Sequence, residues 1–332
     1  MNGWIGLLKN GNRSALMAAI VNLIISVLKA GAFFLTGNVA MYAEMMHSLG
    51  DAANQLFVYT GSALSKKAPT PKFPNGFGRI VNLVCLGAVL VVAILSYETI
   101  IEGIHHILHP AESTGLLINL GVLGLGIVLE SFVLYKASKE VMHDAGLAHN
   151  GISSLPKSFA HLSKAKPPTK LVFMEDLVAT SGGVIAFIAV LLAHFLGWTA
   201  AEGIASIAIG GMMFYVVGKV FLENARGAIG ETDEEMLAHI AHLVAEDPDI
   251  VDIQRVEVVK EGESLHVEIV AEVSTANTVE YVLAVKDRLM TLVLSQKGIQ
   301  DVIISLIGDD GIQSWNDTNS SRLIENRKKL PE

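Results

Sequence analysis

The sequence predicts a mostly helical membrane protein with a small soluble α+β domain at its C-terminal end. Of its 332 residues, 51% are hydrophobic and only 17% are charged, and the mean hydropathy is +0.48. A soluble protein of this size has about one quarter charged residues. The apolar residues are concentrated in residues 1–225, and the remainder has the composition of an ordinary soluble domain. We therefore expect one membrane domain followed by one soluble domain.

Six apolar stretches are long enough to cross a bilayer, which needs about 20 mostly apolar residues per helix. The first, third and fifth links between them contain neither lysine nor arginine, whereas the N-terminal segment and the other links are basic. The positive-inside rule then places both termini in the cytoplasm. The predicted six-helix bundle has its spans at residues 14–35, 39–64, 79–103, 115–135, 171–195 and 200–222.

The soluble end has the element order αββαβ, which predicts a small two-layer α+β domain. Apolar residues recur about every 3.6 residues in the segments expected to be helices and every 2 residues in those expected to be strands. The expected helices and strands cover residues 233–245, 251–259, 265–273, 279–296 and 299–307. The predicted domains are residues 1–230 for the membrane part and 231–308 for the cytoplasmic part. Residues 309–332 form a polar tail that we expect to be disordered.

Four polar residues follow one helical face in the second span. Glu44, His47, Asp51 and Asn54 are three, four and three residues apart, a spacing that aligns them on one stripe. Ionisable groups are costly in a bilayer and usually mark an ion pathway. Imidazole and carboxylate groups are ligands for zinc and its neighbours. The alternative is a stripe that joins helices through hydrogen bonds alone.

A second acidic pair, Glu175 and Asp176, opens the fifth span. Adjacent helical positions point about 100° apart, so Asp176 is the firmer candidate ligand. Glu175 either reaches the same ion or faces water. With His47 and Asp51, these residues predict a metal site between the second and fifth spans.

Further polar groups in the spans have more than one interpretation. Lys29 either extends its amine to the interface or pairs with a buried acid. Glu130 is either a proton relay or the partner of Lys29. Glu202 opens the sixth span, and a cluster at residues 105–109 contains three histidines. That cluster either receives a released ion or is amphipathic surface.

At this point the chain resembles the cation diffusion facilitator family of divalent-metal/proton antiporters. The resemblance covers roughly residues 12–308. It rests on the segment AEMMHSLGDAANQ at residues 43–55, FPNGFGR at residues 73–79, and His-Pro at residues 109–110. The six-span order and the αββαβ end also agree with this family. The resemblance implies a homodimer with metallochaperone-like cytoplasmic domains.

The resemblance also implies transport-site roles for His47, Asp51 and Asp176. The family usually has a histidine four residues before the fifth-helix aspartate, where this chain has Val172. A subgroup with Glu-Asp in the fifth helix is more similar to this chain, and there Glu175 takes the place of the missing ligand. The expected metal ligands are therefore His47, Asp51, Glu175 and Asp176.

The hypothesis is a secondary transporter that moves a divalent transition-metal cation out of the cytoplasm in exchange for protons. Zinc is the first expectation, and manganese, iron, cobalt and nickel stay open because three carboxylates and one nitrogen are a hard ligand set. We do not expect the protein to be an enzyme or to bind a cofactor. The net charge of −9 argues against nucleic acid as a partner. A bacterial inner membrane is the expected location, and the alternative is a non-transporting membrane metal sensor or scaffold.

Overall fold

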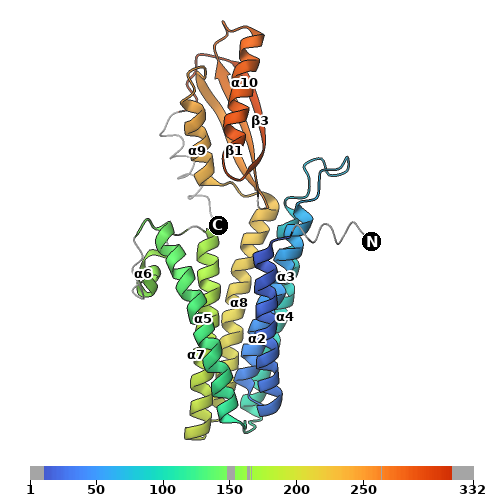
Figure 1. The fold of residues 1–332 in the computed structure, drawn as a ribbon, viewed down its shortest axis with the longest axis vertical. Helices are drawn as coiled ribbons and strands as arrows, with labels where there is room; N and C mark the ends of the chain where they lie inside the picture. Colours follow the sequence, from blue (N-terminus) through green and yellow to red (C-terminus); the bar gives the residue numbers. More distant parts are fainter. Residues whose placement is uncertain (1–10, 148–153, 163–164, 166, 263, 316–332) are drawn as a thin grey trace. The chain divides into compact units, whose positions relative to one another are not determined.

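The computed structural model describes residues 11–147, 154–162, 165, 167–262 and 264–315 (Figure 1). The chain divides into two compact units. The first comprises Met1–Ala63 and Leu83–Asn224, and the second comprises Leu64–Asn82 and Ala225–Glu332. Residues 64–82 thus belong to the unit that contains the C-terminal sheet, whereas the sequence analysis grouped them with the membrane domain.

The first unit is helical, and its long helices cover all six predicted spans (Figure 1). Most extend beyond the predicted ends, because the apolar stretches continue into polar helical turns. The helices are α2 (Arg13–Thr36), α3 (Val39–Ser65), α4 (Ile80–Leu108), α5 (Leu116–Asp144), the short α6 (Ser154–His161), α7 (Pro167–Leu196) and α8 (Ala200–Ile229).

Five of these helices are long and apolar enough to cross a membrane, namely α2, α4, α5, α7 and α8. Helix α3 does not meet this criterion, although its 27 residues would extend about 40 Å at 1.5 Å per residue. Its polar stripe lowers its hydropathy. The structure therefore supports five candidate spans by composition, one fewer than the sequence analysis expected.

The outer surface of the helical unit is apolar. Phe34 of α2 is 80% exposed, Leu117 of α5 is 84% exposed and Val128 of α5 is 66% exposed. Soluble proteins rarely expose large contiguous apolar patches. Together with the five apolar helices, this surface indicates a protein that lies in a membrane.

Helices α4 and α8 approach so closely that their backbones touch. A side chain at Gly103 would place its Cβ 2.7 Å from the carbonyl oxygen of Gly203, and a side chain at Gly203 would meet the carbonyl oxygen of Gly103 at the same distance. One turn away, the Ser206 hydroxyl donates a 2.8 Å hydrogen bond to the carbonyl oxygen of Thr99. Small residues and interhelical hydrogen bonds are the usual means of helix association in membranes.

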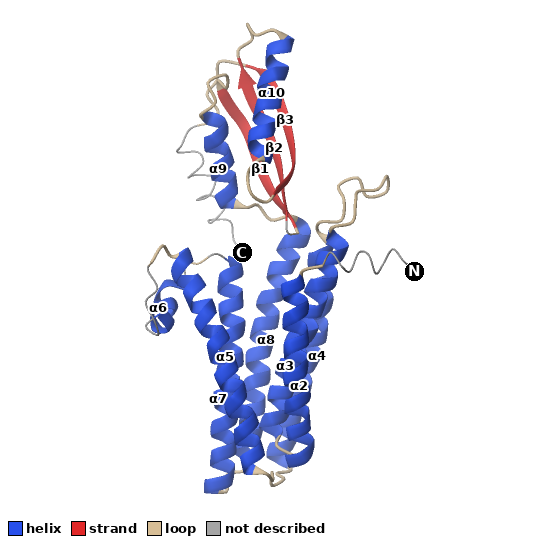
Figure 2. Ribbon diagram, in the orientation of Figure 1, coloured by secondary structure: helices blue, strands red, loops and turns tan. Residues whose placement is uncertain are grey.

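The second unit contains a three-stranded mixed sheet in the order β1-β2-β3 (Figure 2). Strands β1 and β2 pair antiparallel, and β2 and β3 pair parallel, so a crossover through α10 is required. The order agrees with the αββαβ expectation. Its elements are α9 (Glu234–Ala245), β1 (Asp252–Glu261), β2 (Ser264–Val273), α10 (Val279–Leu294) and β3 (Ile299–Gly308).

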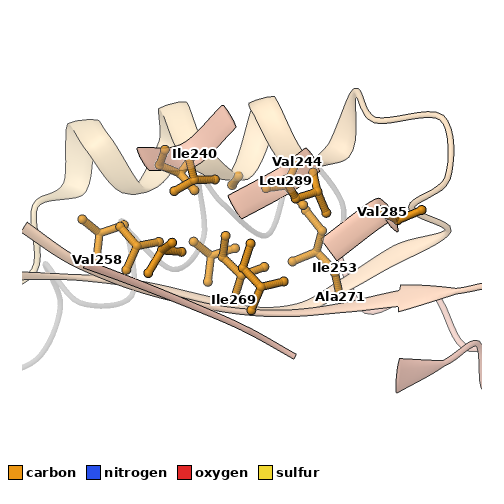
Figure 3. Close-up of a cluster of buried hydrophobic side chains, with 14 residues drawn as sticks. Ile240, Val244, Ile253, Val258, Ile269, Ala271, Val285 and Leu289 are labelled. Atoms are coloured by element: carbon orange, nitrogen blue, oxygen red, sulfur yellow. The ribbon is translucent and has the colours of Figure 1, made fainter. Parts of the chain in front are cut away.

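Both helices of this domain pack on one face of the sheet and form its core (Figure 3). Ile240 of α9 and Leu289 of α10 are fully buried against Val258 and Ile269 of the strands. The alternation of buried and exposed residues along the strands follows from the two-residue period of β structure.

Residues 309–315 belong to the polar tail that was expected to be disordered, but hydrogen bonds and packing hold them against the C-terminal domain. The Asp309 amide donates to the carbonyl oxygen of Val273 at 3.0 Å. The amides of Ser314 and Trp315 both donate to the Asp252 carboxylate, and Trp315 packs against the domain core. An aromatic ring and a buried carboxylate thus fix a segment that is polar in composition. Residues 316–332 lie outside the described part of the chain.

Candidate metal centre

The polar stripe of α3 lies within the helical unit as its spacing predicts. Glu44 and His47 are buried, and the Asp51 side chain is 41% exposed. The His47 Nε2 atom lies 3.5 Å from the Asp51 Oδ2 atom. One turn of helix thus brings an imidazole and a carboxylate together on the same face.

Asp51 also faces Glu175 across a small pocket. This pocket has a volume of about 30 Å³ and contains the side chains of Asp51, Asn54 and Glu175. Valines of α4 and α8 form the rest of its wall: Val89, Val92, Val216, Val217 and Val220. The space is about that of one water molecule or one small ion. The pocket therefore joins the middle of α3, through Asp51, to the acidic pair near the start of α7 in a largely apolar environment.

Asp176 lies on the neighbouring face of α7 and interacts electrostatically with Asp51, as Glu175 does. The Asp176 Oδ2 atom and the His47 Nε2 atom are both buried, and neither finds a hydrogen-bond partner among the described residues. Buried polar atoms in folded proteins nearly always have a partner. Two such atoms beside one pocket fit a site that binds a cation.

The structure brings the four predicted ligands together in pairs and not as a closed set. Among the described residues, no three of His47, Asp51, Glu175 and Asp176 have their ligand atoms within 4.8 Å of one another. Asp51 is the shared member, since it contacts His47 and faces both acids of α7. The four side chains therefore do not form one closed coordination site in this structure.

A buried charge network lies next to this site, and its contacts decide between the two interpretations of Lys29. The Lys29 Nζ atom donates to Glu44 at 2.7 Å, to Glu130 at 3.2 Å and to the Ser48 hydroxyl at 3.0 Å. Lys29 is 1% exposed, so it pairs with buried acids and does not reach the interface. The interpretation of Glu130 as its partner is confirmed.

Ser48 was not identified as a site residue from the sequence, and Gly182 of α7 also contributes to this network. A side chain at Gly182 would place its Cβ 2.7 Å from the Glu44 Oε1 atom. The glycine therefore leaves room for a carboxylate and does not only allow two helices to approach. The spacing of Glu44 and Ser48, four residues apart, is the sequence signal that could have identified Ser48.

One further acidic group occurs in the C-terminal domain. Glu272, Asp309 and Asp310 have carboxylate oxygens within 4.8 Å of one another, the only such group of three among the described residues. Glu272 is fully buried and accepts a 2.7 Å hydrogen bond from the Gln254 amide. This bond and the fold of residues 309–315 account for the position of the buried carboxylate without a metal ion.

The model of the cation efflux transmembrane domain matches residues 15–227, which is most of the chain and all of the helical site described above. The chain belongs to the cation efflux family. The family resemblance drawn from residues 43–55 is thereby confirmed.

Several known proteins are similar to this cation efflux protein. It is 25% identical over 248 residues to the human mitochondrial proton-coupled zinc antiporter SLC30A9, a match that covers 73% of this chain and 42% of the human protein. Metal tolerance protein C4 of Arabidopsis thaliana is 23% identical over 250 residues, covering 72% of this chain and 52% of the plant protein. Zinc transporter ZitB of Escherichia coli is 23% identical over 253 residues, covering 71% of each chain.

This chain therefore spans about half or less of the SLC30A9 and C4 proteins. The relatives are named as transporters or metal tolerance proteins and not as enzymes. Membership of the family and these names support transport of a metal ion by a membrane protein.

Proposed function

We propose that this protein moves a divalent transition-metal cation, with zinc as the first candidate, across a membrane and out of the cytoplasm in exchange for protons. The observation that carries the proposal is the pocket that Asp51 shares with Glu175. The His47 Nε2 atom lies 3.5 Å from Asp51, and the buried Asp176 Oδ2 atom has no hydrogen-bond partner among the described residues. These are the four ligands expected from the sequence. The named function of SLC30A9 and the name of ZitB support zinc as the substrate.

The ligand chemistry supports a hard or borderline divalent cation. One imidazole nitrogen and three carboxylates suit zinc, manganese, iron, cobalt and nickel, whereas soft thiolate ligands would be needed to favour copper(I). Cys85, the chain's single cysteine, lies on α4 and does not line the pocket. The substrate class is therefore a first-row divalent metal ion.

Proton exchange follows from the same ligands. A carboxylate or imidazole must lose its proton before it coordinates a metal ion. A site that alternates between cation-bound and protonated forms therefore carries metal in one direction and protons in the other.

The incomplete convergence of the ligands supports alternating access. A pocket of about 30 Å³ admits one dehydrated ion and little else. Closing α3 onto α7 would bring His47 and Asp176 to the ion that Asp51 and Glu175 first bind. Protons from the opposite side would then displace it.

We also place α3 in the membrane as the sixth span, because its neighbours α2 and α4 are both candidate spans and the links between the helices alternate in basic charge. Both termini are then cytoplasmic, the bilayer is a bacterial inner membrane, and the αββαβ domain is metallochaperone-like. Two copies form a homodimer.

Transport assays in proteoliposomes test the proposal. A metal-sensitive dye and a pH-sensitive dye inside the vesicles report metal entry and proton exit for a panel of zinc, manganese, iron, cobalt and nickel. Asp51→Asn and Asp176→Asn should abolish both signals. Glu98→Gln serves as the matched control, because it neutralises an exposed acid of α4 away from the pocket. Undiminished metal-driven proton flux in both aspartate variants would remove these residues from the mechanism.

A non-transporting metal sensor or scaffold is the second candidate, and the separation of the ligands into pairs is the observation that favours it. Such a protein would bind zinc in detergent, measured by calorimetry, without any uptake into vesicles. Uptake that depends on Asp51 would exclude this candidate.

A further inference from the structure

A second group of buried ionisable side chains lies at the opposite end of the helical unit from Glu175. It is built around Glu202, in the first turn of α8 and 1% exposed. The Ser113 hydroxyl donates a 2.6 Å hydrogen bond to the Glu202 Oε1 atom. The side chain of Asn38 and the backbone of Val39 also face this carboxyl group. One oxygen of the carboxylate is thus well satisfied.

The second oxygen of the Glu202 carboxylate, Oε2, is buried and has no hydrogen-bond partner within the part of the chain that the structure describes. The nearest ionisable group is the imidazole of His106, whose Nε2 atom lies 3.9 Å away. That imidazole is 3% exposed and also contacts the carbonyl oxygen of Thr199 at 3.3 Å. A carboxylate and an imidazole are thus buried together without a lysine or arginine paired to either among the described residues.

A polar cavity of about 290 Å³ lies directly beside the pair. Ser113 and Thr199, the residues that contact Glu202 and His106, are both part of its wall. The titratable groups on that wall are Glu112, in the link before α5, and His194 of α7. At the start of α3, the uncharged Asn38 side chain and the Val39 backbone interact with the Glu202 carboxyl group. The cavity is large enough for several water molecules, so protons can reach the pair from it.

We infer that Glu202 and His106 form a proton-binding pair that loads protons from this cavity for the exchange. The inference deepens the proposed proton exchange and rests on it. A buried carboxylate without a counter-charge is costly, so such a group takes up a proton or a cation. A metal ion would need a third ligand, and none of the described acids or histidines completes a group of three within 4.8 Å of this pair. The proton is therefore the ligand, and it binds to Glu202 Oε2 or to the neighbouring imidazole of His106, whose Nε2 atom lies 3.9 Å away.

The position of the pair fits this role. Asn38 caps the start of α3, where its side chain accepts a 2.8 Å hydrogen bond from the Met41 amide. Glu44 follows six residues later on the same helix, about 9 Å along its axis. Along α3, the Lys29 partner Glu44 therefore lies between the pair and the proposed metal ligands His47 and Asp51.

The test compares Glu202→Gln and His106→Gln with two matched controls at exposed positions. These are Glu98→Gln on α4 and His109→Gln, one residue beyond the end of α4. Zinc affinity is measured by calorimetry in detergent, and zinc-driven proton flux is measured in proteoliposomes over a range of external pH. We expect unchanged zinc affinity in both test variants, loss of coupled proton flux in Glu202→Gln, and a flattened pH dependence in His106→Gln. The controls should behave as the wild type does.

Infrared difference spectroscopy gives a readout that does not depend on transport. The wild type should show the carbonyl stretch of a protonated carboxylic acid that is missing in Glu202→Gln and shifted in His106→Gln. A wild-type spectrum and pH profile in both variants would overturn the inference while leaving the exchange itself intact. A lower zinc stoichiometry in Glu202→Gln would also overturn it, because Glu202 would then bind the cation.

If the wild type moves zinc without protons, the proposed exchange fails, and the infrared band still decides whether Glu202 holds a proton. If Glu202→Gln does not fold, His106→Gln carries the test, since it keeps the carboxylate and its bond to Ser113.

Discussion

Replacing Lys29 by methionine should destabilise the helical unit strongly. The substitution keeps the length of the side chain and removes the charge that three groups share, at 2.7 Å from Glu44, 3.2 Å from Glu130 and 3.0 Å from Ser48. Glu44 would then be a buried acid without its cation. Breaking a buried ion pair on one side typically costs about 3–5 kcal/mol, and that is the loss we expect in the free energy of unfolding.

The assay is reversible unfolding in mixed detergent micelles, followed by tryptophan fluorescence or circular dichroism. A triple variant, Lys29→Met with Glu44→Gln and Glu130→Gln, is the matched control. It should recover most of the lost stability, because removing all members of a buried charge network is far less costly than removing one. A Lys29→Met protein whose unfolding free energy lies within about 0.5 kcal/mol of the wild type, the range of ordinary surface substitutions, would refute the buried network.

Three further changes test other parts of the structure. Gly203→Val should lower the free energy of unfolding by about 1–3 kcal/mol, because the new side chain would overpack the facing backbone of α4. Gly218→Ala is the control, since its side chain would meet no atom within 4 Å, and it should leave thermal unfolding in detergent nearly unchanged. Equal effects of the two substitutions would contradict the close contact of α4 and α8. The Arg288 hydrogen bond holds the pKa of Asp249 below its usual value, so Arg288→Met should destabilise the C-terminal domain above about pH 4, and the difference should vanish as the pH falls below that value. Hydrogen exchange at α10 measures this, and a difference that persisted in acid would argue against the pair. Trp315→Ala should cost about 1–2 kcal/mol through lost burial, and unchanged exchange in the domain core would show that the segment is not docked.

The elements themselves could be predicted from the sequence, because their signals are local. Apolar length located every long helix, and alternation located the three strands within one to two residues. Helix α3 shows the limit of counting apolar residues. It was predicted as an apolar stretch over residues 39–64, but the stripe of Glu44, His47 and Asp51 within that stretch lowers its hydropathy, and it is not among the candidate membrane spans.

The partners of buried groups could not be predicted in the same way. Periodicity fixes which residues share a face, but not how far each helix is rotated against its neighbours. Lys29 therefore kept two interpretations until α3 and α5 were placed around it. For the same reason the spacing within α7 could not say that Asp51 would face both Glu175 and Asp176.

Long-range contacts account for the other differences. The segment 309–315 is polar, and only the position of Asp252, more than fifty residues earlier, shows why it is held. Glu202 and His106 lie on different helices. From the sequence, Glu202 was only a polar group at the start of the sixth span, and His106 was one of three histidines in the cluster at residues 105–109. Their proximity follows from the glycine contact between α4 and α8.

That glycine contact also constrains how the bundle can move. Two helices whose main chains meet at Gly103 and Gly203 cannot slide or rotate past each other without a steric clash. The two helices, which also supply the valines of the pocket wall, should therefore move as one body. For the proposed exchange we expect α3 and α7 to move against them, so distances between labels on α3 and α8 should change with metal and pH, while those between α4 and α8 should stay constant.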